Sequence, residues 1–560
     1  MLSAADAYVV VLALPDIMSG VGVGLDELQR ATPIITGFLL GYVAALPLIG
    51  RLADIYGRVP ALVGCLAVFA FGSLLTAGAD GLGIVVAGRA LQGVGAGGLV
   101  PATLALVADR WPPQRRGIPL GAVGAAQEVG AVVGPLYGGA ILAVTSWRAI
   151  FWANLAGAVV LTGALVAVAG RPGTVRSSGI GSRNLAGGLV GVAGAGGVVL
   201  LLTRPAGLVD SVRYGGVYLP LAGGTDWFSP LAVMSIVLLA GAVAILTSLT
   251  GIQRLFREVD LVGAVLLALA LGGVILAFAG ADPRRQVVGD NAAVLLAVTA
   301  VCAGLLVWHQ RRIAHPLVPG AAIRPRPAWG AMVVNLFVGA ALVAALVDVP
   351  IFARATRYPH SQLGAALVLV EFLVALPIGA LAGGWLTHRM PPRLVASIGM
   401  ALATIGFAAM SRWTGTALDG PQSTVVLVVT GLGFGLAIAP VNAAVLAATR
   451  TSVHGIASAL VVVARTLGML VGLAALTAVG LRIFYGEQDR IGSPLTLCPR
   501  DPAHCPAYTH AIKLALLSEL RAIFVGAALC AALATVLAAV LLRVAPAPRR
   551  SSEGAPLPVR

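Results

Sequence analysis

Apolar stretches of about twenty residues recur from one end of this chain to the other, and they limit its possible folds more than any other feature. Hydrophobic residues make up 59% of the 560 residues and charged residues only 11%, which is too apolar for a water-soluble protein of this length. No stretch shows the alternation of apolar and polar residues that is typical of a lipid-facing strand. The sequence therefore predicts an all-α polytopic membrane protein.

Sixteen segments are long and apolar enough to be candidate spans. Their approximate ranges are residues 1–22, 32–50, 60–79, 83–108, 118–143, 149–170, 185–203, 229–251, 260–280, 291–310, 328–350, 360–386, 393–411, 422–448, 455–484 and 512–543. The pair 185–203 and 229–251 is rich in glycine, and the residues between its members could form a β-hairpin on the membrane surface. If that pair does not span, fourteen spans remain and both termini still lie on the same side.

Arginines in the short connectors indicate the orientation. The formal charge of +15 is spread over many connectors instead of one domain, so it indicates topology and not a nucleic-acid surface. The connectors that contain Arg58, Arg115 and Arg254 lie on the arginine-rich side, which predicts cytoplasmic termini and a multi-pass protein of the cell membrane. The chain opens without the basic segment and cleavage site of a signal peptide, and its first apolar stretch reaches Asp16 early. We therefore expect the natural start to lie upstream of Met1.

One glutamate interrupts a run of small residues, GAVGAAQEVGAVVGPLYGG, from Gly121 to Gly139. Small residues mark the side on which membrane helices pack closely, so we expect Glu128 to face the interior of the bundle. It shares one helix face, at steps of three and four, with Gly117, Gly121, Gly124, Ala131, Pro135 and Gly138. We interpret Glu128 as a protonation site; the alternative is a protonated glutamate that is hydrogen-bonded to a neighbouring helix.

Among the further charged residues inside predicted spans, three are candidates for a functional role: Asp6, Glu371 and Arg465. Arg465 cannot lose its charge and needs an acidic partner or a water-filled cavity. We predict that it forms one interacting set with Asp6 and Glu128, which lie in the opposite half of the chain. The alternative interpretation of Asp6 is a purely structural role. For Glu371 the alternative to a functional role is equally supported: the residue lies at a cavity or at the lipid edge and takes no part in the mechanism.

Two cysteines, Cys498 and Cys505, lie in the long connector before the last span, on the side opposite the arginine-rich connectors. An outside location permits a disulfide that closes a small loop, and a metal site with His504 is the alternative. The sequence shows no other cluster of metal ligands, no nucleophile with its base and no phosphate-binding loop. We therefore expect a protein that is not an enzyme and needs no cofactor or metal. As a protonation site, Glu128 would let such a protein draw its energy from the proton gradient.

The connector GRLADIYGRVPAL resembles the loop signature of the major facilitator superfamily through Gly50, Asp54, Gly57 and Arg58. Val59 departs from the second basic residue that is usual there. The resemblance implies that this loop latches the two halves of a transporter on the cytoplasmic side. It also implies that the latch is remade when the transporter changes state.

Further motifs resemble the same family. The stretch GRALQGVGAGG in the fourth span is similar to its intramembrane arginine motif, which implies a proton-relay or structural role for Arg89. Gly130, Gly134, Pro135 and Gly138 fall at the spacing of the antiporter motif of its drug-exporting branch. The stretches WRAIFWANL and REVDLVGAVLLALALG look like those of fourteen-span drug/proton antiporters. The resemblance implies two six-helix halves with extra linker helices between them, 14 to 16 spans in all.

This resemblance and the apolar pattern together give a division of the chain. We expect an N-terminal six-helix half (1–171), a Gly-rich insertion with two extra spans and an outward hairpin (172–259), a linker helix pair with a cytoplasmic loop (260–327), a C-terminal six-helix half (328–543) and a disordered cytoplasmic tail (544–560). The insertion has no counterpart in the family pattern. The two halves carry similar glycine- and arginine-containing connector motifs, as expected of a repeat architecture with a central path.

The stretches GAAQEVGAVVGPLYG and HGIASALVVVARTLGML are similar to those of mycobacterial exporters of drugs and triacylglycerides that work beside a periplasmic lipoprotein. The resemblance implies a proton-coupled exporter of lipophilic or amphiphilic compounds that works by alternating access. It also implies a monomer with an extracytoplasmic lipoprotein as partner. A proton-coupled importer of a polar solute is the alternative, followed by a membrane scaffold without transport.

Overall fold

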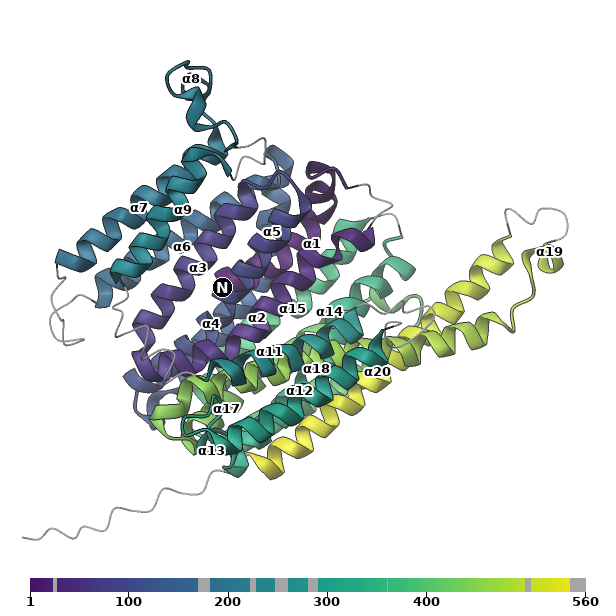
Figure 1. Ribbon diagram of the computed structural model, residues 1–560. Coiled ribbons are helices and arrows are strands. Elements are labelled where there is room, and N and C mark those ends of the chain that lie inside the picture. Colours follow the sequence, from purple (N-terminus) through teal and green to yellow (C-terminus); the bar gives the residue numbers. More distant parts are fainter. Residues whose placement is uncertain are drawn as a thin grey trace, which may run out of the picture.

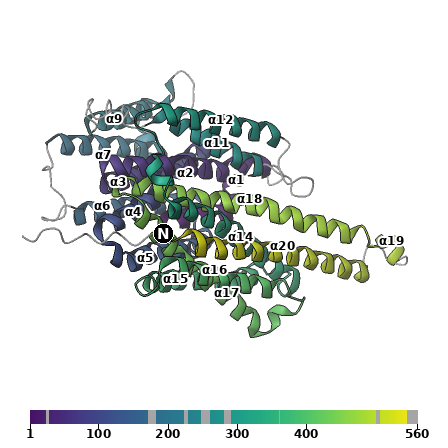
Figure 2. The ribbon, with the colours of Figure 1, turned by 90° about the horizontal axis from the view of Figure 1, so that it is seen from below.

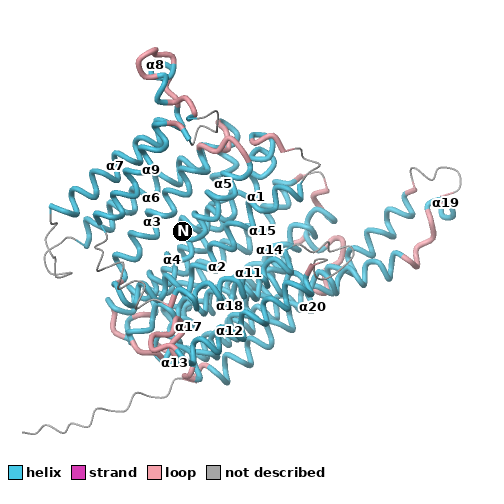
Figure 3. The backbone as a smooth tube through the Cα atoms, in the orientation of Figure 1, coloured by secondary structure: helices cyan, strands magenta, loops and turns pink. Residues whose placement is uncertain are grey.

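The chain folds into a bundle of helices whose axes lie roughly parallel to one another (Figure 1). The computed structural model describes residues 1–23, 28–169, 182–221, 228–246, 260–279, 291–359, 361–498 and 505–543. Within these ranges it contains helices, turns and loops but no strand (Figure 3). Each of the sixteen expected segments coincides with a helix, and 12 of these helices are long and apolar enough to cross a membrane. The predicted all-α membrane fold is confirmed.

Six helices form the first half of the bundle. They are α1 (Leu2–Gly20), α2 (Leu28–Tyr56), α3 (Arg58–Ala77), α4 (Leu82–Arg110), α5 (Gly117–Val144) and α6 (Arg148–Ala169). Glycines allow α4 to approach its neighbours closely: a Cβ on Gly95 would lie 2.6 Å from the carbonyl oxygen of Cys65 on α3. A Cβ on Gly93 would overlap the carbonyl oxygen of Phe38 on α2. Helices in lipid associate through such close packing, because burying apolar side chains gives little drive there.

Six long helices form the second half. They are α14 (Arg326–Thr356), α15 (Gln362–Leu386), α16 (Pro392–Met410), α17 (Pro421–Ala448), α18 (His454–Gln488) and α20 (Pro506–Leu541). Phe434 of α17 is edge-on to Phe372 of α15 and to Phe407 of α16, with ring centroids 6.0 and 5.9 Å apart. Phe407 also stacks on Phe524 of α20 at 6.3 Å. Aromatic packing of this kind joins four helices into one core.

Two linker helices cover the line along which the halves meet. They are α11 (Leu261–Ala279) and α12 (Ala292–Arg312), followed by the short α13 (Gly320–Ile323). Leu271 of α11 belongs to an apolar cluster that also contains Leu46 of α2 and Val463 of α18, one from each half. Asp260 accepts a hydrogen bond from His309 Nε2 at 2.8 Å, which ties the start of α11 to the end of α12. The linker pair is thus anchored on both halves.

The Gly-rich insertion forms an antiparallel helix pair beside the first half (Figure 1). Its members are α7 (Ser182–Thr203) and α9 (Pro230–Leu246), and the connector contains the short α8 (Ala206–Val209) and a 3₁₀ turn, Gly215–Val217. A β-hairpin was one expectation for this connector, but residues 204–221 form turns and short helices. Their backbone N–H groups bond to carbonyls three or four residues earlier, as in Leu208 to Pro205 and Gly215 to Ser211, so these groups are not used for a strand pair.

Two helices of the second half are much longer than a membrane span. α18 has 35 residues and α20 has 36, about 52 and 54 Å at the rise of an α-helix, whereas the hydrocarbon core is about 30 Å thick. They extend past the other helices toward α19 (Pro494–Leu497) (Figure 2). A disulfide joins Cys498 and Cys505 near this tip, with Cα atoms 5.6 Å apart. The tip and α8 lie at one end of the bundle and α13 at the other (Figure 1).

Candidate functional site

A buried network in the first half is built around Asp6 of α1 and Arg89 of α4. Arg89 Nη1 donates to Asp6 Oδ2 at 2.7 Å and to Gln92 Oε1 at 2.9 Å. Asn154 of α6 donates to the other carboxylate oxygen of Asp6 at 2.6 Å. The Asp6 and Arg89 side chains are 0% and 1% exposed. The ion pair is therefore shielded from water, and each carboxylate oxygen has a donor, which a buried charge requires.

Further polar side chains extend this network through the half. Gln92 Nε2 donates to Ser73 Oγ of α3 at 2.8 Å. Tyr137 of α5 donates to Asn154 Oδ1 at 3.1 Å. Sequence reasoning assigned no role to Ser73, Tyr137 or Asn154, although Tyr137 and Asn154 lie in stretches quoted for their resemblance to family motifs. The amide of Asn154 inside a span was the one signal that could have indicated a buried partner.

Glu128 of α5 and Arg465 of α18 form an ion pair between the two halves. Arg465 Nη2 donates to Glu128 Oε1 at 2.9 Å, across 337 residues of sequence. The Glu128 side chain is 8% exposed and that of Arg465 20%. Glu128 thus faces the interior of the bundle, as its position among small residues predicted. The predicted three-membered set is divided, because Asp6 pairs with Arg89 inside the first half.

A small cavity of about 40 Å³ lies beside Arg465. It has room for roughly one to three water molecules. Its lining comes from α4, α5, α14, α17 and α18: Val100, Leu104, Gln127, Asn335, Val338, Ala437, Ile438, Asn442, Val462 and Arg465. Asn335 Nδ2 donates to the Val461 carbonyl at 3.2 Å and Asn442 Nδ2 to the Ile438 carbonyl at 3.0 Å. The junction of the halves is therefore polar and tightly closed in this arrangement.

The small residues of α5 pack closely on other helices, and their neighbours differ between the two ends of α5. Toward the α13 end, a Cβ on Gly121 would lie 2.6 Å from a carbonyl oxygen of α15 in the other half. Toward the α8 end, a Cβ on Gly134 would lie 2.6 Å from a carbonyl oxygen of α1 in the same half. Gly130 and Gly138 also face α1. Glu128 lies between these two regions, where α5 passes from one partner to the other.

The connector between α2 and α3 holds the start of α18. The Asp54 carboxylate accepts two backbone N–H groups from the first turn of α18, at 2.8 and 3.0 Å. Arg58 pairs with Asp54, and it donates from Nε to Asp109 at 3.1 Å and from Nη2 to the Thr451 carbonyl at 2.9 Å. A carboxylate is favourable at a helix N-terminus, where backbone N–H groups are free. The residues of the loop motif thus link the two halves at the α13 end.

Glycines shape the same contact. A Cβ on Gly50 would lie 2.7 Å from the carbonyl oxygen of Gly455, so α2 and α18 touch backbone to backbone. Gly57 has a φ of +99°, a conformation that glycine adopts without steric cost.

In the neighbouring α4–α5 connector, burial lowers the pKa of the Arg116 guanidinium, an effect that the charge of Asp109 opposes. Arg116 stays charged because arginine titrates far above neutral pH.

Glu371 of α15 lies apart from these networks. It is half-buried and lines a cavity of about 240 Å³ together with Arg357, Asp419 and Ser423, at the α8 end of the second half. Among the residues that the structure describes, Glu371 makes no hydrogen bond or ion pair. This position agrees with the alternative that we gave for Glu371, a residue at a cavity.

Two expectations fall on parts of the chain that the structure does not describe. They concern the tail 544–560 and His504, the alternative metal ligand beside the cysteines. In the described ranges no group of three or more His, Cys, Asp or Glu side chains is arranged to hold a metal ion.

Comparison with known proteins places this geometry in a family. Residues 1–473 match the Major Facilitator Superfamily. A triacylglyceride transporter of Mycolicibacterium hassiacum is 36% identical over 518 residues, covering 90% of this chain and 81% of that protein. A triacylglyceride transporter of Mycobacterium tuberculosis is 36% identical over 533 residues, covering 92% of this chain and 88% of that protein. The human organic anion transporter TETRAN shares the fold, with a TM-score of 0.52 at 14% identity and 96% of each chain covered. The chain is therefore a multi-pass membrane transporter that belongs to the major facilitator superfamily.

Proposed function

We propose that this chain exports lipophilic or amphiphilic molecules, lipids among them, across the cell membrane in exchange for protons. The ion pair between Glu128 and Arg465 carries the proposal, because it is a titratable link between the two halves of a transporter fold. The relatives named as triacylglyceride transporters support a lipid as the substrate class.

Protonation of Glu128 gives the coupling a physical route. Charged Glu128 attracts Arg465, which keeps its own charge under all physiological conditions. Neutral Glu128 retains a hydrogen bond from the guanidinium but loses the attraction between opposite charges, so the link between the halves is weaker. Arg465 is 20% exposed beside a small cavity, so water can replace the lost partner. Proton binding therefore shifts the equilibrium between two arrangements of the halves.

Alternating access requires one end of the bundle to close while the other opens. In this arrangement the close approaches described above between the halves lie toward the α13 end, at the Asp54 latch and at Gly121. We infer from the arginine-rich connectors that this end is cytoplasmic and that both termini lie on the same side. Opening it requires Asp54 to release the start of α18, so the latch and the Glu128 pair change together.

The roles expected for Asp6 and Arg89, the lipoprotein partner and the monomeric state are still predictions. For Asp6 and Arg89 the predicted role is a proton relay within the first half, and their hydrogen bonds to a network that includes Asn154 and Tyr137 support it. An extracytoplasmic lipoprotein as partner would meet the α8 end, where α18 and α20 extend beyond the other helices. A monomer agrees with a path that runs between two halves of one chain.

Proton-coupled import of a polar solute is the second candidate. The observation that favours it is the set of amide side chains at the central cavity, Gln127, Asn335 and Asn442. Amides of this kind orient a substrate that carries hydrogen-bonding groups. The direction in which the substrate crosses the membrane distinguishes this import function from the proposed export.

The experiment that tests the proposal uses inverted vesicles with an acid interior and a pH-sensitive dye. Adding a lipid or drug that the protein transports should release protons from vesicles that contain the wild-type chain. We expect Glu128→Gln to reduce this release to the rate of vesicles without the protein. The variant should reach the membrane in normal amount, because glutamine has the same shape and still accepts a hydrogen bond.

Glu487→Gln is the matched control. Glu487 also pairs with an arginine, Arg490 at 3.3 Å, but lies exposed near the tip of α18, so transport should stay at the wild-type rate. Wild-type transport by Glu128→Gln along a pH gradient would show that Glu128 is structural. Uptake of a polar solute in the opposite direction, without a response to lipids, would establish the importer instead.

A further inference from the structure

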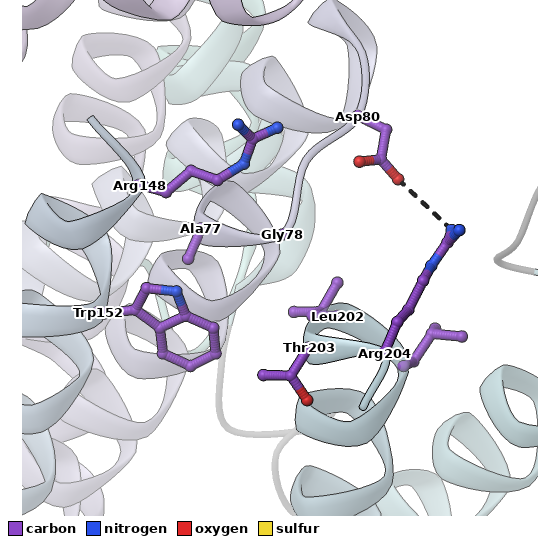
Figure 4. Close-up of a pocket in the computed structure, with 9 residues that line it drawn as sticks. Ala77, Gly78, Asp80, Arg148, Trp152, Leu202, Thr203 and Arg204 are labelled. Atoms are coloured by element: carbon purple, nitrogen blue, oxygen red, sulfur yellow. Dashed lines mark ion pairs between the residues drawn. The ribbon is translucent and has the colours of Figure 1, made fainter. Parts of the chain in front are cut away.

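An aspartate of the second half lacks the partner that the other buried acids of the described structure have. The acidic residues that are buried in the described ranges are Asp6, Glu128, Asp260 and Asp348. The first three lie 2.7, 2.9 and 2.8 Å from a basic side chain. Even the exposed Asp80, at a cavity between α3, α6 and α7, lies 4.0 Å from Arg204 (Figure 4). Asp348 of α14 is only 4% exposed, yet it makes no hydrogen bond and no ion pair with a described residue.

The charge that acts on Asp348 is a second acid. Glu519 of α20 repels the Asp348 carboxylate across the contact between the two helices. Glu519 is half-buried and packs on α18, where a Cβ on Gly480 would lie 3.0 Å from the Cγ atom of Glu519. Gly480 thus makes room for the glutamate side chain. Val349, next to Asp348, and Ile523, one turn after Glu519, belong to the apolar core of this half.

No positive side chain compensates these two acids in the described structure. The elements that pack most closely around α14 are α13, α15, α17, α18 and α20. Toward the α8 end, these elements, α14 itself and the adjoining connectors carry the charged or titratable residues Arg354, Arg357, Glu371, Arg412, Asp419, Arg482, Glu487, His510, Lys513 and Arg521. Arg521, two residues after Glu519, donates to the Trp413 carbonyl at 2.9 Å. None of the cations forms an ion pair with Asp348 or Glu519.

The two acids fit a proton better than a metal ion. An ionised carboxylate in apolar surroundings is unfavourable, and a second negative charge beside it makes the ionised form less favourable still. A metal ion that binds oxygen takes several ligands. In the described ranges no group of three or more His, Cys, Asp or Glu side chains is arranged to hold one. A proton needs a single carboxylate oxygen.

We propose that Asp348 is a second proton-binding site of this protein, and that Glu519 passes the proton between Asp348 and water at the α8 end. Thr356, the last residue of α14, follows Asp348 by eight residues, about 12 Å along the helix. Glu519 is the more exposed of the two acids, so water reaches it first. A proton from water binds the Glu519 carboxylate and then moves to Asp348, which becomes neutral. Release follows the same steps in reverse.

Proton binding at Asp348 has a route to the rest of the molecule. Pro350 lacks a backbone N–H, so α14 can bend two residues after Asp348. Gly480, which contacts Glu519, lies on the same helix as Arg465, 15 residues or about 22 Å away. A role in transport rests on the proposed exchange of substrate for protons, whereas proton binding itself does not. Each transport cycle then exchanges a proton in each half.

Infrared difference spectroscopy of the purified full-length protein in lipid tests proton binding directly. A protonated carboxyl group has a C=O stretching band that a carboxylate lacks. At neutral pH we expect this band in the difference between wild type and Asp348→Asn, a variant of nearly the same shape. Glu519→Gln should keep the band, because Asp348 is still buried without a cation. It should slow the shift of the band in deuterated water about tenfold, because the acid that relays the proton is lost.

A count of protons tests the role in transport. Inverted vesicles with a pH-sensitive dye and a labelled lipid give the number of protons exchanged per substrate molecule. Asp348→Asn should exchange one proton fewer than wild type. Asp489→Asn is the matched control, because Asp489 is an exposed acid that follows α18 at the same end of the bundle. It should show neither the infrared difference nor a change in the proton count.

The outcomes separate this site from the proposed function. Absence of the band from the Asp348→Asn difference spectrum overturns the site, and so does a band that disappears when sodium ions are added, which would make the pair a cation site. Unchanged exchange in Glu519→Gln overturns the relay, and it does so even if Asp348→Asn fails to fold. An unchanged proton count in Asp348→Asn overturns the role in transport. If the wild type moves substrate without protons, the proposed function fails, and the infrared band alone decides whether Asp348 binds a proton.

Discussion

Two arginine–carboxylate pairs in this protein have the same chemistry and opposite surroundings. Asp6 and Arg89 lie within one half, at 0% and 1% exposure, and both carboxylate oxygens accept hydrogen bonds. Glu128 and Arg465 come from different halves, at 8% and 20% exposure, beside a small cavity. The first pair cannot separate without leaving a charge in an apolar interior. We propose that the second pair separates when the halves move, because its members come from different halves and the adjoining cavity can admit water.

The difference shows that burial alone does not identify a switching residue. We propose that the enclosed pair stabilises the half in which it lies, and that the pair between the halves changes with the state of the transporter. The same division applies to the glycines of α5, which pack on α15 near one end and on α1 near the other. Glu128 lies where α5 changes partner, so a small change at this residue acts on both contacts.

Breaking the enclosed pair should have the largest effect. Asp6→Ala leaves Arg89 buried without a counter-charge, which costs about 3–5 kcal/mol of stability. We expect a much lower yield of folded protein and a lower melting temperature in detergent. Asp16→Ala is the control, because Asp16 is an exposed acid on the same helix. Equal melting temperatures for the two variants would contradict a structural role of the Asp6–Arg89 pair.

Breaking the interface pair should change the arrangement of the halves more than their stability. Spin labels at Gln114 and His388, on exposed connectors of the two halves, report whether the α13 end is closed. Glu128→Gln and Arg465→Ala should each open this end, and the double variant should show a coupling of about 1–2 kcal/mol.

The same labels test whether the two ion pairs act separately. Asp6→Asn and Arg465→Ala should shift the populations additively, within about 0.5 kcal/mol. Additive effects of Glu128→Gln and Arg465→Ala would instead remove the coupling across the halves. A strong coupling between Asp6 and Arg465 would restore the single interacting set that the sequence suggested.

The smallest effect is expected for an acid that belongs to neither pair. Glu371 is half-buried at a cavity near the α8 end, without an ion pair in the described structure. Glu371→Gln should change the transport rate by no more than about twofold, as for substitutions away from a network. Dye-loaded inverted vesicles measure this rate beside Glu128→Gln. A loss as complete as that of Glu128→Gln would add Glu371 to the proton path.

Most of the fold could be predicted because apolar segments longer than a bilayer is thick form helices almost regardless of context. The sequence located α18 and α20 but ended α18 at residue 484 instead of Gln488 and began α20 at residue 512 instead of Pro506. Hydropathy marks the part of a helix in lipid and not the part that continues into water. The connector after α7 was harder, because glycine-rich segments fit a hairpin or a series of turns equally well. Its local hydrogen bonds, such as Leu208 to Pro205, became visible in the structure.

The candidate site was predictable at the level of single residues. A charge inside an apolar span is expensive, so Asp6, Glu128 and Arg465 stood out without any knowledge of their neighbours. Ser73, Tyr137 and Asn154 did not, because an uncharged polar side chain is tolerated in a span by bonding to its own helix. Their role depends on a partner from another helix, which the sequence does not name.

The sequence by itself determined which segments are helical, that Glu128 faces the interior of the bundle and which connector carries the family motif, because these properties depend on local composition and spacing. The tertiary structure decided which acid meets which arginine. Asp6 and Arg89 are separated by 83 residues and Glu128 and Arg465 by 337, so their pairing depends on the order and rotation of the helices between them. The structure also divided the glycines of α5 between two neighbours, since one helix face looks the same in sequence whichever helix covers it.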